Sequence, residues 1–322
     1  MEIDYLQLAI DKAWEYQFLT YPNPAVGAAI IIDNKVFVNA HKKAGNPHAE
    51  VEVLWEAFSF YHNTPNLNSS KEIHDYLYKH HNNFFNNSIM YITLEPCNHY
   101  GKTPACADLI SIIKPKKVVI GWRDPISSHS GGIAKLQKIG IEVEVLDDKR
   151  CFNLIEPFIK WQKQFIFFKL ATSLNGVYTG GYITQKETLT WVHKIRNNLD
   201  LIIIGGETVR IDRPTLDSRM VDGKAPDILI YSKNKKFDKK IPLFNVKNRK
   251  VFISDNLDII KNYKFIMIEG GENLYKQLKN KVDWKVWTIN ISKIINKENF
   301  KNDDNLDIIH TRMDKDLIVF SK

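Results

Sequence analysis

The 322-residue sequence is poor in cysteine, and none of its apolar runs approaches the ~20 residues needed to cross a bilayer. Three cysteines cannot build a disulfide framework. The first residues, Met1-Glu2-Ile3-Asp4, are acidic and lack the pattern of a secretory signal peptide. We therefore expect a cytoplasmic protein that has no membrane partner.

The sequence also lacks two motifs that would point to particular functions. It has no G-x-G-x-x-G, so a classical dinucleotide-binding fold is not supported. It has no C-x-x-C, which nucleoside and nucleic-acid deaminases usually carry. The net charge of +8 suits nucleic acid, a phosphorylated substrate or a phosphorylated cofactor equally well. Because lysine is abundant along the whole chain, this charge is weak evidence for any one of them.

One histidine and two cysteines form the strongest motif. His48 and Glu50 lie in Pro47-His48-Ala49-Glu50, and eight residues separate Cys97 from Cys106. One His and two Cys supply three zinc ligands and leave the fourth position open to water, as in catalytic zinc sites. Glu50 is placed to move protons, and H-x-E followed by Pro-Cys is typical of zinc deaminases that act on base-like rings. A closed structural zinc site would need a fourth ligand, for which His99 is the only nearby candidate.

The first half of the chain predicts a layered α/β domain over residues 1–146, because strands alternate with helices. Helices are expected at 1–20, 48–60, 132–139 and from Pro104, and strands at 25–32, 35–40, 89–94, 117–121 and 141–146.

Residues 61–88 are crowded with Asn and His, which leaves two interpretations. One is a metal-binding histidine tract, and the other is a solvated insertion with a short helix at 71–81. We favour the insertion, because no acidic partner is evident to complete a metal site.

The second half predicts another α/β domain, over residues 147–322, after a charged helical connector at 147–164. The segment Glu269-Gly270-Gly271 follows a strand and precedes a helix, where free amide groups suit a phosphate. Strands are expected at 166–171, 201–205, 227–231, 250–253 and 264–268, and helices at 184–197 and 272–279.

At this level of detail the sequence resembles the bifunctional deaminase–reductases of riboflavin biosynthesis. The resemblance rests on 21–27, 47–50 and the loop from Cys97 to Cys106 in the first half. In the second half it rests on 169–174, His193 with Arg196, 208–219 and 269–271. It covers nearly the whole chain in the right order, and the spacing of Cys97 and Cys106 is its most specific motif.

The resemblance implies a cytidine-deaminase-like three-layer domain followed by a dihydrofolate-reductase-like α/β domain. It also implies two reactions on a phosphorylated pyrimidine ribotide. The first is zinc-dependent deamination, with one Zn²⁺ per chain, and the second is reduction of the ribosyl group by NADPH. A homo-oligomer that does not bind nucleic acid is expected.

The resemblance also implies roles for individual residues. His48, Cys97 and Cys106 would bind zinc, and Glu50 would be the proton donor. The first substrate site would include Asn23, His41, His99 and Lys102. The second would include Lys169, Arg196, Leu216, Arg219 and Glu269. The cofactor would contact Ala171, Tyr182, Thr208, Asp212, Ser232, Gly270 and Gly271.

Three residues in the second half depart from the pattern of this family. Asn175 stands where Asp is usual, Tyr182 where Trp is usual, and Arg213 replaces the second Asp of a pair. These changes predict a reduced or retuned reductase. Two alternatives remain open: a deaminase with a degenerate second domain, and a deaminase of nucleosides or nucleic acids. A zinc-stabilised binding module is disfavoured by Glu50.

Overall fold

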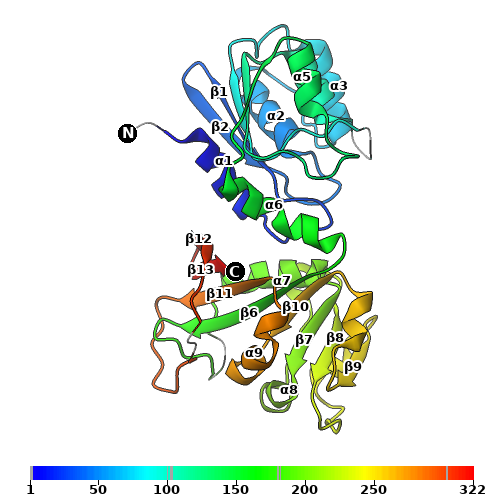
Figure 1. Cartoon of the computed structure of the whole chain (residues 1–322), viewed down its shortest axis with the longest axis vertical. Coiled ribbons are helices and arrows are strands. Elements are labelled where there is room, and N and C mark those ends of the chain that lie inside the picture. The colour runs from blue at the N-terminus through cyan, green and yellow to red at the C-terminus, as the bar shows by residue number, and fades with distance from the viewer. Residues whose placement is uncertain (1–2, 100, 102–103, 180, 182, 302–303) are drawn as a thin grey trace. The chain divides into compact units, whose positions relative to one another are not determined.

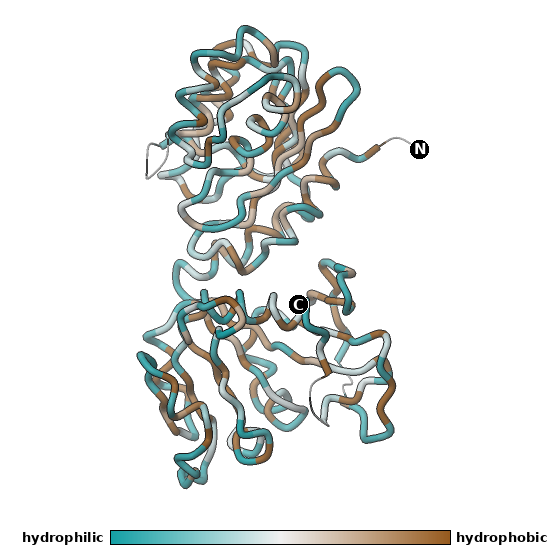
Figure 2. Tube along the Cα trace, turned by 180° about the vertical axis from the view of Figure 1, so that it is seen from behind, coloured by the Kyte–Doolittle hydropathy of each residue, from teal (hydrophilic) through white to brown (hydrophobic). Residues whose placement is uncertain are grey.

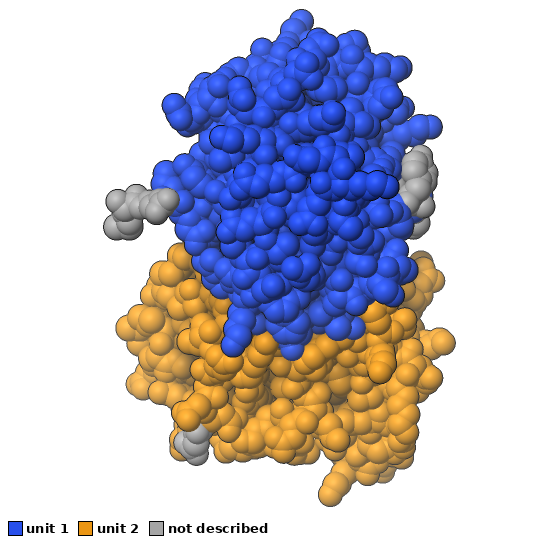
Figure 3. All heavy atoms as spheres, turned by 45° about the horizontal axis from the view of Figure 1, so that its top comes forward, with its two compact units in different colours: residues 1–159 blue, residues 160–322 orange. Residues whose placement is uncertain are grey.

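The computed structural model describes all residues except 1–2, 100, 102–103, 180, 182 and 302–303 (Figure 1). The chain forms two compact units, Met1–Ile159 and Lys160–Lys322, which Figure 3 distinguishes by colour. Hydrophobic residues recur along the chain in both units (Figure 2). Within the part of the chain that the structure describes, every helix is too short or too polar to cross a membrane.

Unit 1 contains a five-stranded sheet with the order β2-β1-β3-β4-β5. Its strands are β1 (Gly27–Ile32), β2 (Lys35–Ala40), β3 (Ile89–Ile92), β4 (Lys117–Ile120) and β5 (Glu142–Val145). β1 pairs with β2 and β3 in antiparallel fashion, whereas β3, β4 and β5 are parallel. The parallel part therefore has loops at the carboxyl ends of its strands, where α/β sheets commonly place functional residues.

Among the described residues, six helices belong wholly or partly to unit 1. They are α1 (Tyr5–Trp14), α2 (Ala49–Tyr61), α3 (Ser70–His80), α4 (Cys106–Ile113), α5 (Gly132–Lys138) and α6 (Lys149–Trp161). Nearly every residue of β1 is buried, which requires cover on both faces because successive side chains point to opposite sides. Gly27 permits the close approach of α1, since a Cβ there would lie 1.9 Å from the Ala9 carbonyl oxygen.

The stretch from 61 to 88 contains α3, as the sequence predicts. Ser69 caps the helix: its hydroxyl accepts a hydrogen bond from the Glu72 amide (3.2 Å) and donates one to the Glu72 carboxylate (2.7 Å). Ile73 and Leu77 are buried, so α3 is packed onto the domain rather than wholly solvated. Among the described residues, no group of potential metal ligands includes a histidine of this stretch.

Unit 2 contains an eight-stranded sheet with the order β12-β13-β11-β6-β10-β7-β8-β9. Its strands are β6 (Phe165–Ser173), β7 (Leu201–Gly205), β8 (Asp227–Tyr231), β9 (Val251–Ser254), β10 (Phe265–Glu269), β11 (Trp284–Asn290), β12 (Ile308–Met313) and β13 (Leu317–Ser321). From β11 to β9 the neighbouring strands are parallel, and β13 pairs with β11 and β12 in antiparallel fashion.

The helices of unit 2 are α7 (Lys186–Asn198), α8 (Gly206–Asp212) and α9 (Glu272–Leu278). A hydrophobic core forms between the central strands and α9. Its members include Phe168, Ile203, Ile268 and Leu274, all 5% exposed or less. The alternation of strand and helix in this half agrees with the sequence, but β11, β12 and β13 were not predicted. β12 is mostly exposed and carries His310 and Arg312, so it lacks the apolar signal of a buried strand.

The compact units divide inside α6, whereas the sequence placed the boundary between residues 146 and 147. The reason lies in the packing of this helix. Cys151 is fully buried against Gly121, where a Cβ would meet its sulfur at 2.3 Å. At the other end of α6, Trp161 packs on Phe265 with ring centroids 5.3 Å apart. The helix is therefore not a solvated connector.

Candidate functional site

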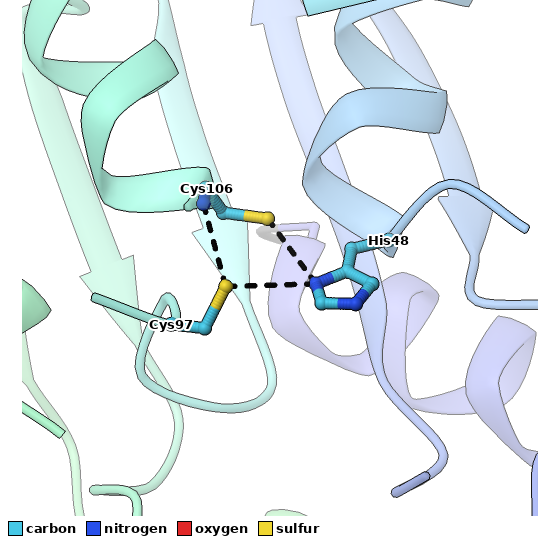
Figure 4. A group of neighbouring side chains, drawn as sticks. All are labelled: His48, Cys97 and Cys106. Atoms are coloured by element: carbon cyan, nitrogen blue, oxygen red, sulfur yellow. Dashed lines mark hydrogen bonds between the residues drawn. The ribbon is translucent and has the colours of Figure 1, made fainter. Parts of the chain in front are cut away.

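His48, Cys97 and Cys106 come together in unit 1 although they lie far apart in the sequence (Figure 4). His48 is the N-cap of α2, Cys97 lies in the loop after β3, and Cys106 is the first residue of α4. The Nδ1 atom of His48 lies 3.6 Å from the Cys97 sulfur and 3.4 Å from the Cys106 sulfur. All three ligand atoms are within 4.8 Å of one another.

This spacing fits a zinc ion. A tetrahedral Zn²⁺ bound at ordinary bond lengths holds a nitrogen and a sulfur ligand about 3.6 Å apart. Both observed nitrogen–sulfur distances are close to that value. Within the described residues the group has three members, and His99 is not among them. Three protein ligands with a fourth position open to water are what a catalytic zinc site requires.

The start of α4 stabilises the Cys97 sulfur as a thiolate. Pro104 does not begin this helix, because Ala105 remains extended and serves as its N-cap. Cys106 therefore occupies the first helical position, where its free amide donates a hydrogen bond to the Cys97 sulfur (3.4 Å). Hydrogen bonding by Cys106, helped by His48 and opposed by burial, lowers the pKa of Cys97 to about 4. Thiolate, the metal-binding form, is thus favoured at Cys97, whereas hydrogen bonding with Cys97 and burial raise the pKa of Cys106 well above its ordinary value.

Glu50 lies in the first turn of α2, two residues after His48, and its side chain is almost completely buried. Burial raises the pKa of Glu50 to about 7, although His48 opposes this change. A carboxyl group that is neither firmly ionised nor firmly protonated near neutral pH suits proton transfer.

His41 and Asn23 form a hydrogen-bonded chain beside His48. The Nδ1 of His41 lies 3.0 Å from the Pro47 carbonyl oxygen, which can only accept, so Nδ1 carries the proton. The Nε2 of His41 then accepts from the Asn23 amide nitrogen at 3.1 Å. Burial lowers the pKa of His41 to about 4, which keeps the ring neutral. The centroid of the His41 ring is 5.3 Å from that of His48, so His41 borders the metal group.

The loop between Cys97 and Cys106 is described only in part, and Lys102 lies outside the described residues. His99 is described and half-buried, and its ring stacks on His129. Glu95 holds the segment that carries His129: the buried carboxylate accepts hydrogen bonds from the amides of Asp124, Gly131 and Ile133 at 2.9–3.1 Å. Sequence reasoning assigned no role to Glu95 or His129.

In unit 2 the sheet brings together Lys169, Arg196 and Glu269. Lys169 on β6 and Glu269 on β10 are register partners. The Glu269 carboxylate accepts from the Lys169 amine at 3.0 Å and from the Arg196 guanidinium at 2.9 Å. Burial would raise the pKa of Glu269, but Lys169 and Arg196 outweigh it and lower the pKa to about 2. Two cations and one anion leave one positive charge in the cluster.

The candidate cofactor residues lie where strands end along one edge of the same sheet. Ala171 is near the end of β6, Thr208 follows β7, Ser232 follows β8, and Gly270 with Gly271 follows β10. A Cβ on Gly206 would lie 2.5 Å from the Ser232 hydroxyl, so the loops after β7 and β8 touch. Asp212 is the last residue of α8 and is exposed, and Tyr182 lies outside the described residues.

Comparisons with known proteins agree with this division. The family described as "Cytidine and deoxycytidylate deaminase zinc-binding region" matches residues 1–122. The family described as "RibD C-terminal domain" matches residues 164–289. Both halves of the chain are thus similar to RibD proteins.

Relatives within the RibD family align with most of the chain. The riboflavin biosynthesis protein RibD of Synechocystis sp. is 33% identical over 226 residues, which are 67% of this chain and 55% of that protein. RibD of Buchnera aphidicola is 29% identical over 324 residues, covering 96% of this chain and 77% of that protein. The chain spans about half the length of several curated relatives.

A solved structure shares the fold along almost the whole chain. It is a diaminohydroxyphosphoribosylaminopyrimidine deaminase/5-amino-6-(5-phosphoribosylamino)uracil reductase from Thermotoga maritima. The comparison covers 99% of this chain and 98% of that one, with a TM-score of 0.65 and 24% sequence identity. The predicted fold class was a cytidine-deaminase-like domain followed by a dihydrofolate-reductase-like α/β domain. It is confirmed as two α/β domains, the first matching the deaminase zinc-binding region and the second the RibD C-terminal domain.

Two departures from the RibD pattern have structural consequences. The side-chain amide of Asn175 both accepts and donates hydrogen bonds. Its Oδ1 accepts from the Ser173 hydroxyl and from the Ile295 amide, and its Nδ2 donates to the Ile295 carbonyl oxygen. An Asp could not donate that last bond. Arg213 has a left-handed backbone (φ 44°) and pairs with Asp238 at 2.7 Å. Both residues thus have local partners.

His193 on α7 belongs to the charged cluster, although sequence reasoning gave it no role. It is 2% exposed, and its Nδ1 has no hydrogen-bond partner among the described residues. Burial, followed by the charge of Arg196, lowers the pKa of His193 to about 4. Arg219 also contributes to this shift, so it faces the same region, but it is exposed and pairs with Asp217 at 2.7 Å.

Leu216, a candidate substrate residue, has a strained left-handed backbone with φ 56°. Arg249 stabilises this loop by donating to the carbonyl oxygens of Thr215 (2.6 Å) and Leu216 (2.8 Å). Sequence reasoning missed Arg249. A cavity of about 440 Å³ lies nearby and includes Arg219, Lys224 and Lys247 in its wall.

Proposed function

We propose that this chain is a bifunctional enzyme of riboflavin biosynthesis. Its first reaction would deaminate a diaminopyrimidinone that carries a ribosylamino 5′-phosphate, and its second would reduce the ribosyl group to ribityl with NADPH. The observation that carries the proposal is the group of His48, Cys97 and Cys106, with nitrogen–sulfur distances of 3.4 and 3.6 Å. The RibD relatives supply the expected substrate.

In the first reaction, His48, Cys97 and Cys106 would hold the zinc ion. When bound, zinc acts as a Lewis acid and makes water a stronger nucleophile at neutral pH. Glu50 would accept a proton from the attacking water and deliver it to the departing amine. Its burial beside His48 supports this role. A carboxyl group that is shielded from water has a raised pKa, so it can take up and release a proton near neutral pH. Asn23 and His41 would orient the substrate.

In the second reaction, Lys169 and Arg196 would attract the phosphorylated sugar. The buried Nε of Arg196 has no partner among the described residues and is an available donor. Leu216, Arg219 and Glu269 would complete the substrate site. The strand ends at Ala171, Thr208, Ser232 and Gly270–Gly271 fit a dinucleotide, because ligands of open α/β sheets bind at such an edge.

A second candidate function is deamination alone. It is favoured by the pairing of Glu269 with both Lys169 and Arg196, which leaves only a small excess of positive charge for a phosphate. The local partners of Asn175 and Arg213 point the same way, because neither residue supplies the carboxylate usual in the family.

One experiment separates these functions. The full chain, loaded with Zn²⁺, is incubated with the diaminopyrimidinone ribotide with and without NADPH, and the products are weighed by mass spectrometry. We expect exchange of an amine for oxygen in both samples and the addition of two hydrogens only with NADPH. Deamination without reduction would support the second candidate, and an unchanged ribotide would refute both. Homo-oligomeric assembly and a cytoplasmic location stay predictions.

A further inference from the structure

His129 contributes an aromatic contact that no family motif assigns. Its ring stacks on that of His99 with centroids 4.4 Å apart and an angle of 18° between the planes. On the helix α6, Phe158 stacks more loosely with His129, at 6.5 Å and 25°. The three rings, which we call the His99 stack, come from three segments that are distant in the sequence.

The backbone fixes the position of His129 independently of its ring. The His129 carbonyl oxygen accepts from the Asn98 amide at 3.1 Å, which ties this segment to the residue after Cys97. Glu95 holds the following residues through the Gly131 and Ile133 amides. The side chain of His129 is thus not needed to place the loop, and its contact with His99 requires another explanation.

Stacking leaves the nitrogen atoms of His99 available, because they lie on the edge of the ring and not on its face. The Nδ1 of His99 is buried and has no hydrogen-bond partner among the described residues. A buried polar nitrogen without a partner costs free energy unless a ligand satisfies it. His99 lies two residues after Cys97, a half-buried member of the metal group.

We propose that His129 is a positioning residue of the deaminase site. It holds the His99 ring in the orientation in which an edge nitrogen hydrogen-bonds an oxygen of the ribosyl phosphate of the substrate. This inference rests on the proposed function, because it takes the pyrimidine ribotide as the ligand. It goes beyond that function by assigning affinity for the ribotide to a residue that never touches the reacting ring.

The test compares substitutions that remove or retain the stacking face. Ribotide binding is measured by calorimetry in zinc-loaded Glu50→Gln protein, in which substrate is not consumed. An aromatic pair contributes enough to change affinity by about threefold to tenfold. We therefore expect His129→Ala to weaken binding by about that factor, and His129→Phe to bind within about twofold of the parent because its ring face is retained.

The same substitutions are then made in protein with Glu50 intact. We expect His129→Ala to raise KM and leave kcat, zinc content and melting temperature unchanged. His80→Ala, which removes an exposed histidine of α3, is the matched control and should change none of these quantities.

Three results would overturn the proposal: unchanged binding in His129→Ala, equal weakening in His129→Phe, or loss of zinc or of stability in His129→Ala. Failure of the proposed function is recognised separately, because the parent with intact Glu50 would then not deaminate the ribotide at all. If the Glu50→Gln parent also fails to bind the ribotide, both proposals are refuted.

Discussion

The metal group of unit 1 and the charged cluster of unit 2 represent opposite ways of preparing a site. His48, Cys97 and Cys106 place three donor atoms at a spacing that suits a tetrahedral zinc ion. Lys169, Arg196 and Glu269 instead pair with one another, with one positive charge in excess and the Nε of Arg196 without a partner among the described residues. The first arrangement gains most of its interactions when a ligand arrives, whereas the second already has most of them.

The difference indicates which kind of change each site tolerates. Without any one of the three metal ligands, the other two should not hold the zinc ion, so the first site should lose its function completely. In the second site, loss of one partner leaves buried charges without compensation, so stability and binding should suffer together. The predictions below test this contrast, beginning with the largest effect.

Metal removal should separate the two halves most clearly. Dialysis of the full chain against a chelator should abolish deamination and leave NADPH-dependent reduction of separately supplied deaminated ribotide intact, because the described metal group lies entirely in unit 1. Added Zn²⁺ should restore deamination. Both activities are followed by mass spectrometry, and a loss of reduction on chelation would contradict the contrast.

Glu50→Gln should reduce deamination by about 10²–10⁴-fold, because the amide cannot accept and return a proton. Zinc content should stay at one per chain, since Glu50 is not part of the three-residue metal group. Turnover and metal content are measured on the same preparation. Glu52→Gln, a change in the same helical turn, is the control. Near-normal turnover in Glu50→Gln would show that the proton follows another route.

Glu269→Gln should destabilise unit 2 by about 3 kcal/mol, because Lys169 and Arg196 would remain buried without their carboxylate. Denaturant unfolding measures this change. Deamination should not change. The exposed pair of Asp258 and Lys261 provides the control, and Asp258→Asn should alter stability by less than about 0.5 kcal/mol. An equally small effect of Glu269→Gln would mean that the cluster contributes little to folding.

His193 should produce the smallest effect, a change in the pH dependence of stability. Its pKa is lowered to about 4 in the folded protein, against an ordinary value of 6.5. Between these values the unfolded chain binds a proton that the folded chain does not, so stability decreases as the pH falls from 6.5 towards 4. His193→Gln should reduce the slope of stability against pH by the equivalent of up to one bound proton, whereas His80→Gln should leave the slope unchanged. The test is to measure melting curves of the parent and both variants across this pH range.

Much of the fold follows from local sequence signals. The alternation of apolar strands with helices is strong in β1, β7 and β10, and all three were predicted within a residue or two. Of the three C-terminal strands that were not predicted, β12 has no buried residue and so gives little signal. β11 alternates between buried and half-buried positions and β13 is an apolar run, so both carry a strand signal that the sequence reading overlooked.

The candidate sites likewise contain residues that the sequence could predict and residues that it could not. The metal group was predictable because His48, Cys97 and Cys106 have side chains whose chemistry is specific and whose spacing is distinctive. The supporting residues were not, because a Glu, His or Arg gains its role only from partners far along the chain. Glu95 meets amides around residues 124–133, and Arg249 meets carbonyls at 215 and 216. Such long-range hydrogen bonds leave no local pattern in the sequence.

The packing of α6 has a consequence for separating the two proposed activities into independent proteins. Cys151, at one end of the helix, fills the space beside Gly121, and Trp161, at the other end, covers Phe265. A gene split before residue 149 would leave Gly121 uncovered, and one after residue 161 would leave Phe265 uncovered. Fission of this gene would therefore require each product to keep its own copy of the helix, and a fragment starting at 162 would expose Phe265 and be prone to aggregation.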